Sequence, residues 1–261
     1  MALMPPLVTI MVKAAESAAK ALARDFGEAE QLQVSKKGPS DFVSAADKRA
    51  EKTIHHTLVK ARPDFGFLME EGGTFDGKDP NRRFIVDPLD GTNNFLHGIP
   101  HWAITIAAEE NGEITAGIVF DVVRNELFWA AKGTGAFIRN RKIRVSSRND
   151  LEMSVVTCGS PAKGRGDHER FAKDMAAVLP VVSGMRRMGS AALDMAYVAA
   201  GRVDAYWERQ ISPWDVAAGV LIVREAGGFV SEVNGGKNAV YGGSILASNA
   251  GVYQDMRSLL K

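Results

Sequence analysis

Two aspartates three positions apart, Asp87 and Asp90, follow the apolar run 84–86 and precede a glycine and a threonine. The apolar run predicts the end of a buried strand, and the carboxyl edge of the strands is where open α/β sheets commonly bind ligands. Two carboxylates this close repel each other unless a cation lies between them. Carboxylates, a backbone carbonyl and a threonine hydroxyl are hard oxygen ligands, which suit Mg²⁺ rather than zinc. The segment therefore predicts a magnesium site.

Two further acidic residues, Glu70 and Asp215, are candidates for the same site. Glu70 ends a predicted strand over 65–69, at a glycine-rich turn. Asp215 follows Ser212 and Pro213, which are typical of a helix cap and a first helical turn. An acidic residue in a first turn is more often only a partner of the helix dipole. Gathered at one cleft, however, the four carboxylates would hold two or three Mg²⁺ ions.

The elements before residue 150 predict helices packed on an antiparallel sheet. Apolar residues recur at helical spacing over 6–26, and Ser44 is a candidate cap for a second helix that ends before Pro63. Strand-like runs separated by turn signals follow at 102–108, 114–120 and 126–130.

Beyond residue 150 the pattern changes to strands that alternate with helices. The predicted strands are 155–158, 181–186 and 205–207, and the predicted helices are 167–178, 190–200 and 213–226. No repeat or linker separates the two parts, so we expect one domain, 1–261, with halves of about 1–150 and 151–261.

Composition favours an ordinary globular enzyme. The 261 residues are 46% hydrophobic and 24% charged, with a net charge of +1. This charge gives no reason to expect nucleic acid or an anionic membrane as the main partner. A single cysteine favours a reducing compartment. Residues 1–12 lack the basic start and cleavage site of a secretory signal, so we expect a cytoplasmic protein.

Five segments together resemble the signatures of the inositol monophosphatase family, in the expected order and over about residues 35–247. They are Asp41 to Lys48, Glu70-Glu71, Asp87 to Phe95, Gly133 to Phe137 and Pro213 to Gly219. The resemblance implies an α/β (α+β) fold, a layered α-β-α-β-α sandwich with a mostly antiparallel N-terminal sheet and a mixed C-terminal sheet. It also implies a Mg²⁺-dependent phosphomonoesterase that is a homodimer and is inhibited by Li⁺.

The same resemblance assigns roles to individual residues. The implied magnesium ligands are Glu70, Asp87, the Leu89 carbonyl, Asp90, Thr92 and Asp215, with Asp90 shared between ions. Asp47 is implied to pair with the Thr92 hydroxyl and to support a nucleophilic water, which Glu70 and Thr92 position. The implied contacts to substrate are Asp90, Gly91, Thr92, Ser160, Gly189, Ser190, Ala191, Glu208 and Asp215. Glu208 matches the family glutamate that binds inositol hydroxyls.

Three alternatives remain open from the residues. A haloacid dehalogenase-type phosphatase uses an Asp nucleophile in Asp-x-Asp-Gly-Thr, whereas two residues separate Asp87 from Asp90 here. Relatives within the family act on fructose 1,6-bisphosphate, histidinol phosphate or 3′-phosphoadenylates. A non-catalytic, metal-dependent regulatory protein is the third alternative.

Overall fold

The computed structural model describes residues 4–27, 34–36, 42–161, 164 and 166–261. Its α-helices are α1 (Pro6–Phe26), α2 (Ala45–Ala61), α3 (Thr92–Leu96), α4 (His168–Val178), α5 (Ala191–Ala199), α6 (Pro213–Glu225) and α7 (Tyr253–Leu259), with 3₁₀-helices η2 (Leu151–Met153) and η3 (Leu179–Val181). Helix α1 agrees with the helix predicted from apolar spacing, and α2 agrees with the second helix predicted to end before Pro63. The Ser44 cap and Asp41 lie outside the residues or side chains that the structure describes.

The larger sheet has eight strands in the order β10-β9-β8-β7-β6-β5-β3-β4. They are β3 (Gly66–Met69), β4 (Gly73–Phe75), β5 (Arg82–Asp90), β6 (Ala103–Glu110), β7 (Glu113–Asp121), β8 (Glu126–Ala131), β9 (Gly135–Ile138) and β10 (Arg141–Ile143). Only the β3/β5 pair is parallel. The mostly antiparallel N-terminal sheet is therefore confirmed. A separate antiparallel pair is formed by β1 (Val34–Lys36) and β2 (Phe42–Ser44).

The smaller sheet has five strands in the order β12-β11-β13-β15-β14. They are β11 (Val155–Cys158), β12 (Gly184–Arg186), β13 (Ala205–Arg209), β14 (Phe229–Ser231) and β15 (Ser244–Ser248). Strand β11 is parallel to both of its neighbours, whereas β15 is antiparallel to β13 and β14. The sheet is mixed, as expected. The change from one sheet to the other falls at residues 144–154, and the assignment of both sheets to one domain stays a prediction.

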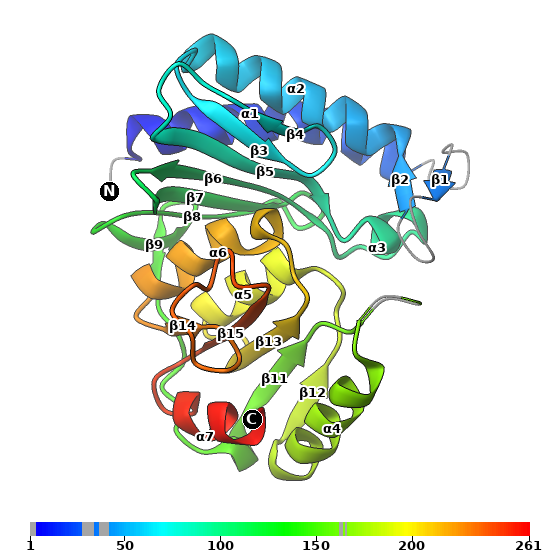
Figure 1. Cartoon of the computed structure of the whole chain (residues 1–261), viewed down its shortest axis with the longest axis vertical. Coiled ribbons are helices and arrows are strands. Elements are labelled where there is room, and N and C mark those ends of the chain that lie inside the picture. Colours follow the sequence, from blue (N-terminus) through cyan, green and yellow to red (C-terminus); the bar gives the residue numbers. More distant parts are fainter. Residues whose placement is uncertain (1–3, 28–33, 37–41, 162–163, 165) are drawn as a thin grey trace.

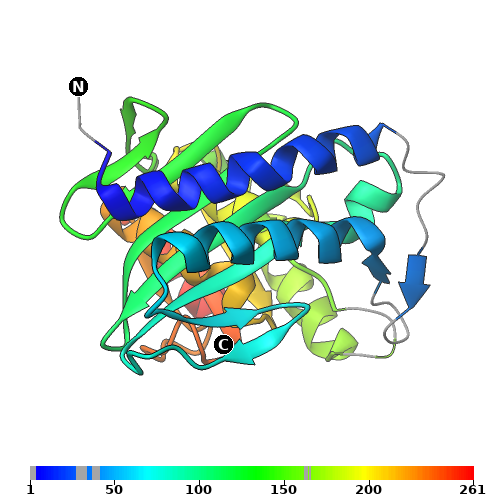
Figure 2. The same cartoon turned by 90° about the horizontal axis from the view of Figure 1, so that it is seen from above.

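Helices and sheets alternate in five layers (Figure 1). Helices α1 and α2 lie side by side on the outer face of the larger sheet, which Figure 2 shows from above. Helices α5 and α6 lie between the two sheets, and α4 and α7 cover the far face of the smaller one. The layered α-β-α-β-α sandwich is confirmed.

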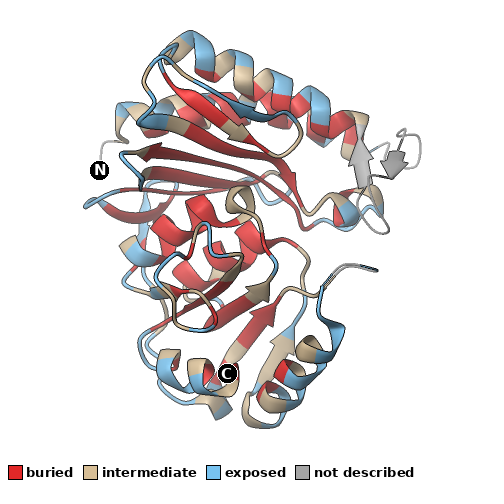
Figure 3. Ribbon diagram, in the orientation of Figure 1, coloured by how far each residue is buried: buried red, intermediate tan, exposed pale blue. Residues whose placement is uncertain are grey.

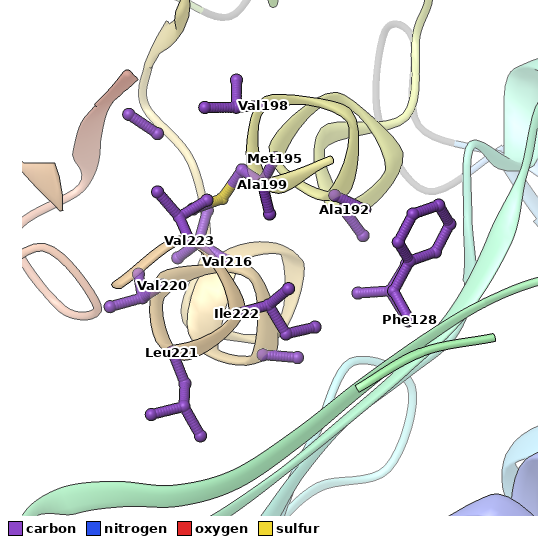
Figure 4. Packing of buried hydrophobic residues seen from close by; sticks show 14 of the residues in the cluster. Phe128, Ala192, Met195, Val198, Ala199, Val216, Val220, Leu221, Ile222 and Val223 are labelled. Atoms are coloured by element: carbon purple, nitrogen blue, oxygen red, sulfur yellow. The ribbon is translucent and has the colours of Figure 1, made fainter. Parts of the chain in front are cut away.

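The helices of the central layer are deeply buried (Figure 3). In α6, residues 216–223 are all buried, and the side chains of α5 and α6 interdigitate against Phe128 of the larger sheet (Figure 4). The two helices pack so closely that a Cβ atom on Gly219 would lie 2.7 Å from Met195 Sδ. No helix in the described ranges is long and apolar enough to cross a membrane. Because α6 is held on every side, the residues at its N-terminus have a fixed position.

Two predicted strands have different limits in the structure. The strand predicted over 181–186 begins only at Gly184, because Val181 is the last residue of the helical turn η3, which contains Pro180. The strand predicted to end at Val86 continues as β5 to Asp90. Its register against β6 shifts between Asp87 and Asp90, around Pro88, which has no N–H to donate to the ladder. The two candidate aspartates therefore lie in the last, irregular part of a strand.

Replacing Asp204 is expected to destabilise the junction between the sheets. The carboxylate is fully buried and accepts hydrogen bonds from the Ser146 hydroxyl, from Arg148 Nε at 2.8 Å and from Val155 N at 2.9 Å. Asp204→Ala leaves these donors without their acceptor, at a cost of about 2–4 kcal/mol. Thermal unfolding should show a Tm lower by about 5–15 °C. The exposed Asp76 provides the control: if Asp76→Ala lowers Tm equally, the buried network has no special role.

Candidate active site

Three carboxyl groups from two elements meet between the sheets. One carboxylate oxygen each from Asp87 and Asp90 on β5 and from Asp215 on α6 lie within 4.8 Å of one another. Glu70 follows β3, which is parallel to β5, and its charge acts on both Asp87 and Asp215. The structure therefore gathers three of the four acidic residues that the sequence analysis singled out, and it places Glu70 near enough for its charge to act on two of them.

The end of β5 gives Asp87 and its neighbours a defined geometry. Asp87 Oδ1 accepts a hydrogen bond from Leu89 N at 2.8 Å, and the Thr92 hydroxyl donates to the Leu89 carbonyl at 2.9 Å. Gly91 has a φ of 96°, and a Cβ atom there would lie 3.1 Å from the His101 carbonyl oxygen. Glycine is the residue that permits this turn, after which α3 begins at Thr92.

Asp90 is fixed by the start of α5, about 100 residues later in the chain. Its Oδ2 accepts hydrogen bonds from the Ser190 hydroxyl and from Ala192 N, the latter at 2.8 Å. Ser190 is also the N-cap of α5. In this structure Ser190 therefore contacts Asp90, and its expected contact with substrate stays a prediction.

Asp215 is held by the start of α6. Ser212 and Asp215 form a capping box in which Asp215 Oδ2 accepts a hydrogen bond from Ser212 N at 2.9 Å. The far end of the helix is also fastened, since the Glu225 carboxylate accepts the N–H groups of Gly133 and Gly135, each at 2.7 Å. This contact gives the segment 133–137 a structural role away from the site.

The carboxyl groups lie in an environment that disfavours their charge. Burial raises the pKa of Asp90 to about 6. Burial also raises the pKa of Asp87 and of Asp215 well above the usual range, and neighbouring carboxylates add to both shifts. A divalent cation would relieve both the repulsion and the desolvation of these oxygens. The donor set is entirely oxygen, which fits Mg²⁺.

A cavity of about 130 Å³ opens beside these carboxylates. Its lining is Asp90, Gly159, Arg187, Gly189, Ser190, Ala191, Asp194, Glu208, Ile211 and Asp215. The Tyr206 hydroxyl donates a hydrogen bond to Glu208 Oε2, and Arg187 Nε donates to Ser160 Oγ at 3.0 Å. Six of the ten lining residues were expected from the sequence; the other four, Gly159, Arg187, Asp194 and Ile211, were not. The two charged ones carry no local sequence signal: Arg187 follows β12 and Asp194 lies on α5, and only the packing of the fold brings them to one cavity.

Asp47 lies in the first turn of α2 and is 1% exposed. The same helix is linked to the segment of Glu70, because Glu71 N donates to Glu51 Oε2 at 2.9 Å. The expected pairing of Asp47 with the Thr92 hydroxyl stays a prediction.

Comparisons with known proteins agree on one family. The sequence model of the inositol monophosphatase family matches residues 4–260. The chain is 52% identical over 255 residues to an inositol-1-monophosphatase of Mesorhizobium japonicum, which covers 98% of this chain and 95% of the relative. It is 48% identical over 232 residues to a protein of Xylella fastidiosa named Nus factor SuhB, covering 88% of this chain and 83% of that protein. The crystal structure of the extragenic suppressor protein suhB from Bartonella henselae has a TM-score of 0.96 at 49% identity, over 98% of this chain and 99% of that one.

Proposed function

Because the chain belongs to the inositol monophosphatase family, we propose that it hydrolyses myo-inositol 1-phosphate to myo-inositol and phosphate, with Mg²⁺ as its cofactor. The observation that carries the proposal is the meeting of Asp87, Asp90 and Asp215 beside a cavity that also contains Glu208. A relative that shares about half of its residues with this chain is named for the same activity.

The residues that would hold the cation are Glu70, Asp87, the Leu89 carbonyl, Asp90, Thr92 and Asp215. When bound, Mg²⁺ supplies Lewis-acid chemistry that activates water and neutralises the charge of the phosphate. Two or three ions per site are proposed, with Asp90 shared between them. The raised pKa values of Asp87, Asp90 and Asp215 support this role, because buried acids in one cluster are otherwise costly to ionise.

The protein's own groups orient the reactants. Thr92 and Glu70 would hold the attacking water, and Asp47 would accept a proton through the Thr92 hydroxyl. The backbone N–H groups of Gly91 and Thr92, at the start of α3, would bind phosphate oxygens, and Asp90 and Asp215 would hold the cation that neutralises their charge. Since water attacks directly, no phosphoenzyme forms, and trapping of a phosphoaspartate at Asp87 would contradict the mechanism.

The leaving group would lie in the cavity, against Glu208, Ser160 and the segment Gly189-Ser190-Ala191. Glu208 lies at its wall, where a Cβ atom on Gly159 would come within 1.8 Å of the Glu208 carboxylate. A carboxylate in this place can accept hydrogen bonds from ring hydroxyls. The arrangement supports a polyol phosphate as the substrate.

A kinetic panel tests the assignment of substrate. It compares kcat/KM for myo-inositol 1-phosphate, fructose 1,6-bisphosphate, histidinol phosphate and a 3′-phosphoadenylate, with Mg²⁺ present. We expect the highest value for the inositol ester. A clear preference for one of the other three would assign the same chemistry to that substrate instead.

Glu208→Gln is expected to change the choice of substrate more than the chemistry. The amide keeps the size of the side chain but weakens its hydrogen bonds to hydroxyls, by about 1–2 kcal/mol. We expect kcat/KM for myo-inositol 1-phosphate to fall about tenfold, with a smaller change for phenyl phosphate, which has no hydroxyls. Equal losses of kcat/KM for both esters would show that Glu208 does not determine substrate specificity.

A regulatory protein without catalysis is a second candidate, because relatives at 48% identity include one named Nus factor SuhB. The two functions are distinguished by turnover. Absence of Mg²⁺-dependent phosphate release from every ester of the panel would leave only the regulatory function.

We further propose a homodimer that is inhibited by Li⁺, as the family resemblance implies. The proposal of a cytoplasmic location rests on the single cysteine, Cys158, which is buried. The homodimer is tested by light scattering on the protein as it elutes from a sizing column, which measures its molecular mass directly. A mass of 28.1 kDa rather than twice that value would contradict the dimer.

A further inference from the structure

Asn94 is a buried amide beside the candidate site to which the mechanism gives no role. It lies on α3, two residues after Thr92, and is 6% exposed. Its side-chain nitrogen, Nδ2, donates hydrogen bonds to the carbonyl oxygens of His101 and Met188, both at 2.8 Å. Because both partners are acceptors, a single group with two N–H donors, which asparagine carries, satisfies them at once. The amide therefore joins three segments of the chain at one point.

The two hydrogen bonds connect the two parts of the chain. His101 lies two residues before β6 of the larger sheet, whereas Met188 lies between β12 of the smaller sheet and α5. Met188 is two residues before Ser190, which caps α5 and donates a hydrogen bond to Asp90. One side chain thus links the edge of the larger sheet to the segment that holds Asp90.

The turn at Gly91 is packed between the same two segments. A Cβ atom on Gly91 would lie 3.1 Å from the His101 carbonyl oxygen and 3.3 Å from the Gly189 carbonyl oxygen. A Cβ atom on Gly189 would in turn lie 3.0 Å from Asn94 Nδ2. With contacts this close, a change in the spacing of the two segments moves the turn and, with it, Thr92.

We propose that Asn94 is a positioning residue for the hydrolysis of the phosphate ester. Its two hydrogen bonds hold the His101 and Met188 carbonyls at the spacing that fixes the Gly91–Thr92 turn relative to the start of α5, where Asp90 is held. This inference rests on the proposed function and deepens it, because it names the side chain that keeps these two parts of the site in one arrangement.

Asn94→Ala, compared with Asn249→Ala, tests the inference. Asn249 is a matched control because it is 1% exposed and its Nδ2 also donates two hydrogen bonds, to Ser146 Oγ and Asp204 Oδ1, near the start of β13 and at the opposite end of that strand from Glu208. We expect both variants to lower Tm by about 5–10 °C. Only Asn94→Ala should lower kcat/KM, by about 10- to 100-fold at a temperature where both proteins are folded, since a displacement of about 1 Å at a reacting site costs about this much.

The loss should be independent of the leaving group. For Asn94→Ala we expect the same factor with myo-inositol 1-phosphate and with phenyl phosphate, in contrast to Glu208→Gln. The inhibition constant of inorganic phosphate should rise about fivefold, because the displaced turn carries the N–H groups proposed to bind phosphate oxygens. A side chain that only stabilised the fold would leave this constant unchanged in the folded protein.

Three outcomes would overturn the inference. Equal kcat/KM values for Asn94→Ala and Asn249→Ala would show that Asn94 only stabilises the fold. A loss confined to the inositol ester, or an unchanged inhibition constant for phosphate, would show that Asn94 does not act through the turn. Should Asn94→Ala not fold, Asn94→Ser is compared with Asn249→Ser in the same way, because a serine hydroxyl donates only one hydrogen bond. Failure of the proposed function is distinguishable, since the wild-type protein itself would then not hydrolyse the inositol ester.

Discussion

Asp90→Asn should reduce kcat by about 10³-fold or more, a loss of about 4 kcal/mol of transition-state stabilisation. Asp90 is the proposed shared ligand, and its position is set from both sides, by the end of β5 and by Ser190 and Ala192 at the start of α5. The amide removes one negative charge and one metal-binding oxygen from the centre of the cluster. Steady-state kinetics at saturating Mg²⁺ measures the loss.

The fold of the variant should persist. Without metal, removal of one charge from a repelling cluster relieves its neighbours, because the charge of Asp90 contributes to the raised pKa of both Asp87 and Asp215. We expect the metal-free Tm of Asp90→Asn to equal or exceed that of the wild type. Glu113→Gln is the matched control, since Glu113 is an exposed acid on β7 paired with Lys132. If Asp90→Asn retains a tenth of the wild-type kcat, Asp90 is not a shared ligand.

Mg²⁺ should raise the Tm of the protein, and the increase should depend on pH. At a concentration of 100 Kd a ligand that binds only the folded state contributes about 2.7 kcal/mol, or about 5–10 °C for a chain of this size. Protons compete with the cation for the same oxygens. We therefore expect the full increase near pH 7.5 and almost none near pH 4.5.

The direction of the pH effect follows from the raised pKa values. The pKa of Asp90 is about 6 in the folded protein against an ordinary 3.8, so between these values the folded state binds more protons than the unfolded one. The stability that Asp90 contributes in the metal-free protein is present at low pH and is lost as pH rises through this window. Asp87 and Asp215 shift in the same direction. Differential scanning fluorimetry from pH 4.5 to 8, with and without Mg²⁺, measures both trends; an increase in Tm that is independent of pH would contradict them.

Local sequence patterns predicted the elements that begin with clear signals. The periodicity over 6–26 matches α1, and Ser212-Pro213 matches the capped start of α6. These features depend on neighbours within a few residues, and such interactions can be recognised without knowledge of the fold. The match to family signatures then indicated the layered architecture, which the strand order confirms.

The elements missed lie where local signals are weak or contradictory. Strands β14 and β15 and helix α7 follow α6 in a segment rich in glycine, which resembles a loop until Phe229–Ser231 and Ser244–Ser248 pair with each other. The apolar run 84–86 predicted an end of the strand at Val86, whereas β5 continues through Pro88 to Asp90. Pairing with distant strands decided these cases, and distant pairing is not visible in a local window.

The residues of the candidate site also differ in whether the sequence alone predicts their positions. Its acidic residues follow recognisable strand and helix ends, so their meeting was predictable as a hypothesis. The contact of Ser190 with Asp90 spans 100 positions, and Asp194 is a single acid in an otherwise ordinary buried helix. Both depend on how α5 packs between the two sheets, a property of the whole fold.

The central claim is that acidic residues from β5, α6 and the end of β3 together bind divalent cations next to the substrate. Anomalous diffraction from crystals soaked in Mn²⁺, an ion of similar ligand preference, tests it most directly. We expect peaks within bonding distance of Asp87, Asp90 and Asp215, with Glu70 at one of them. A fully active, Mn²⁺-soaked protein whose anomalous peaks all lie elsewhere would contradict it.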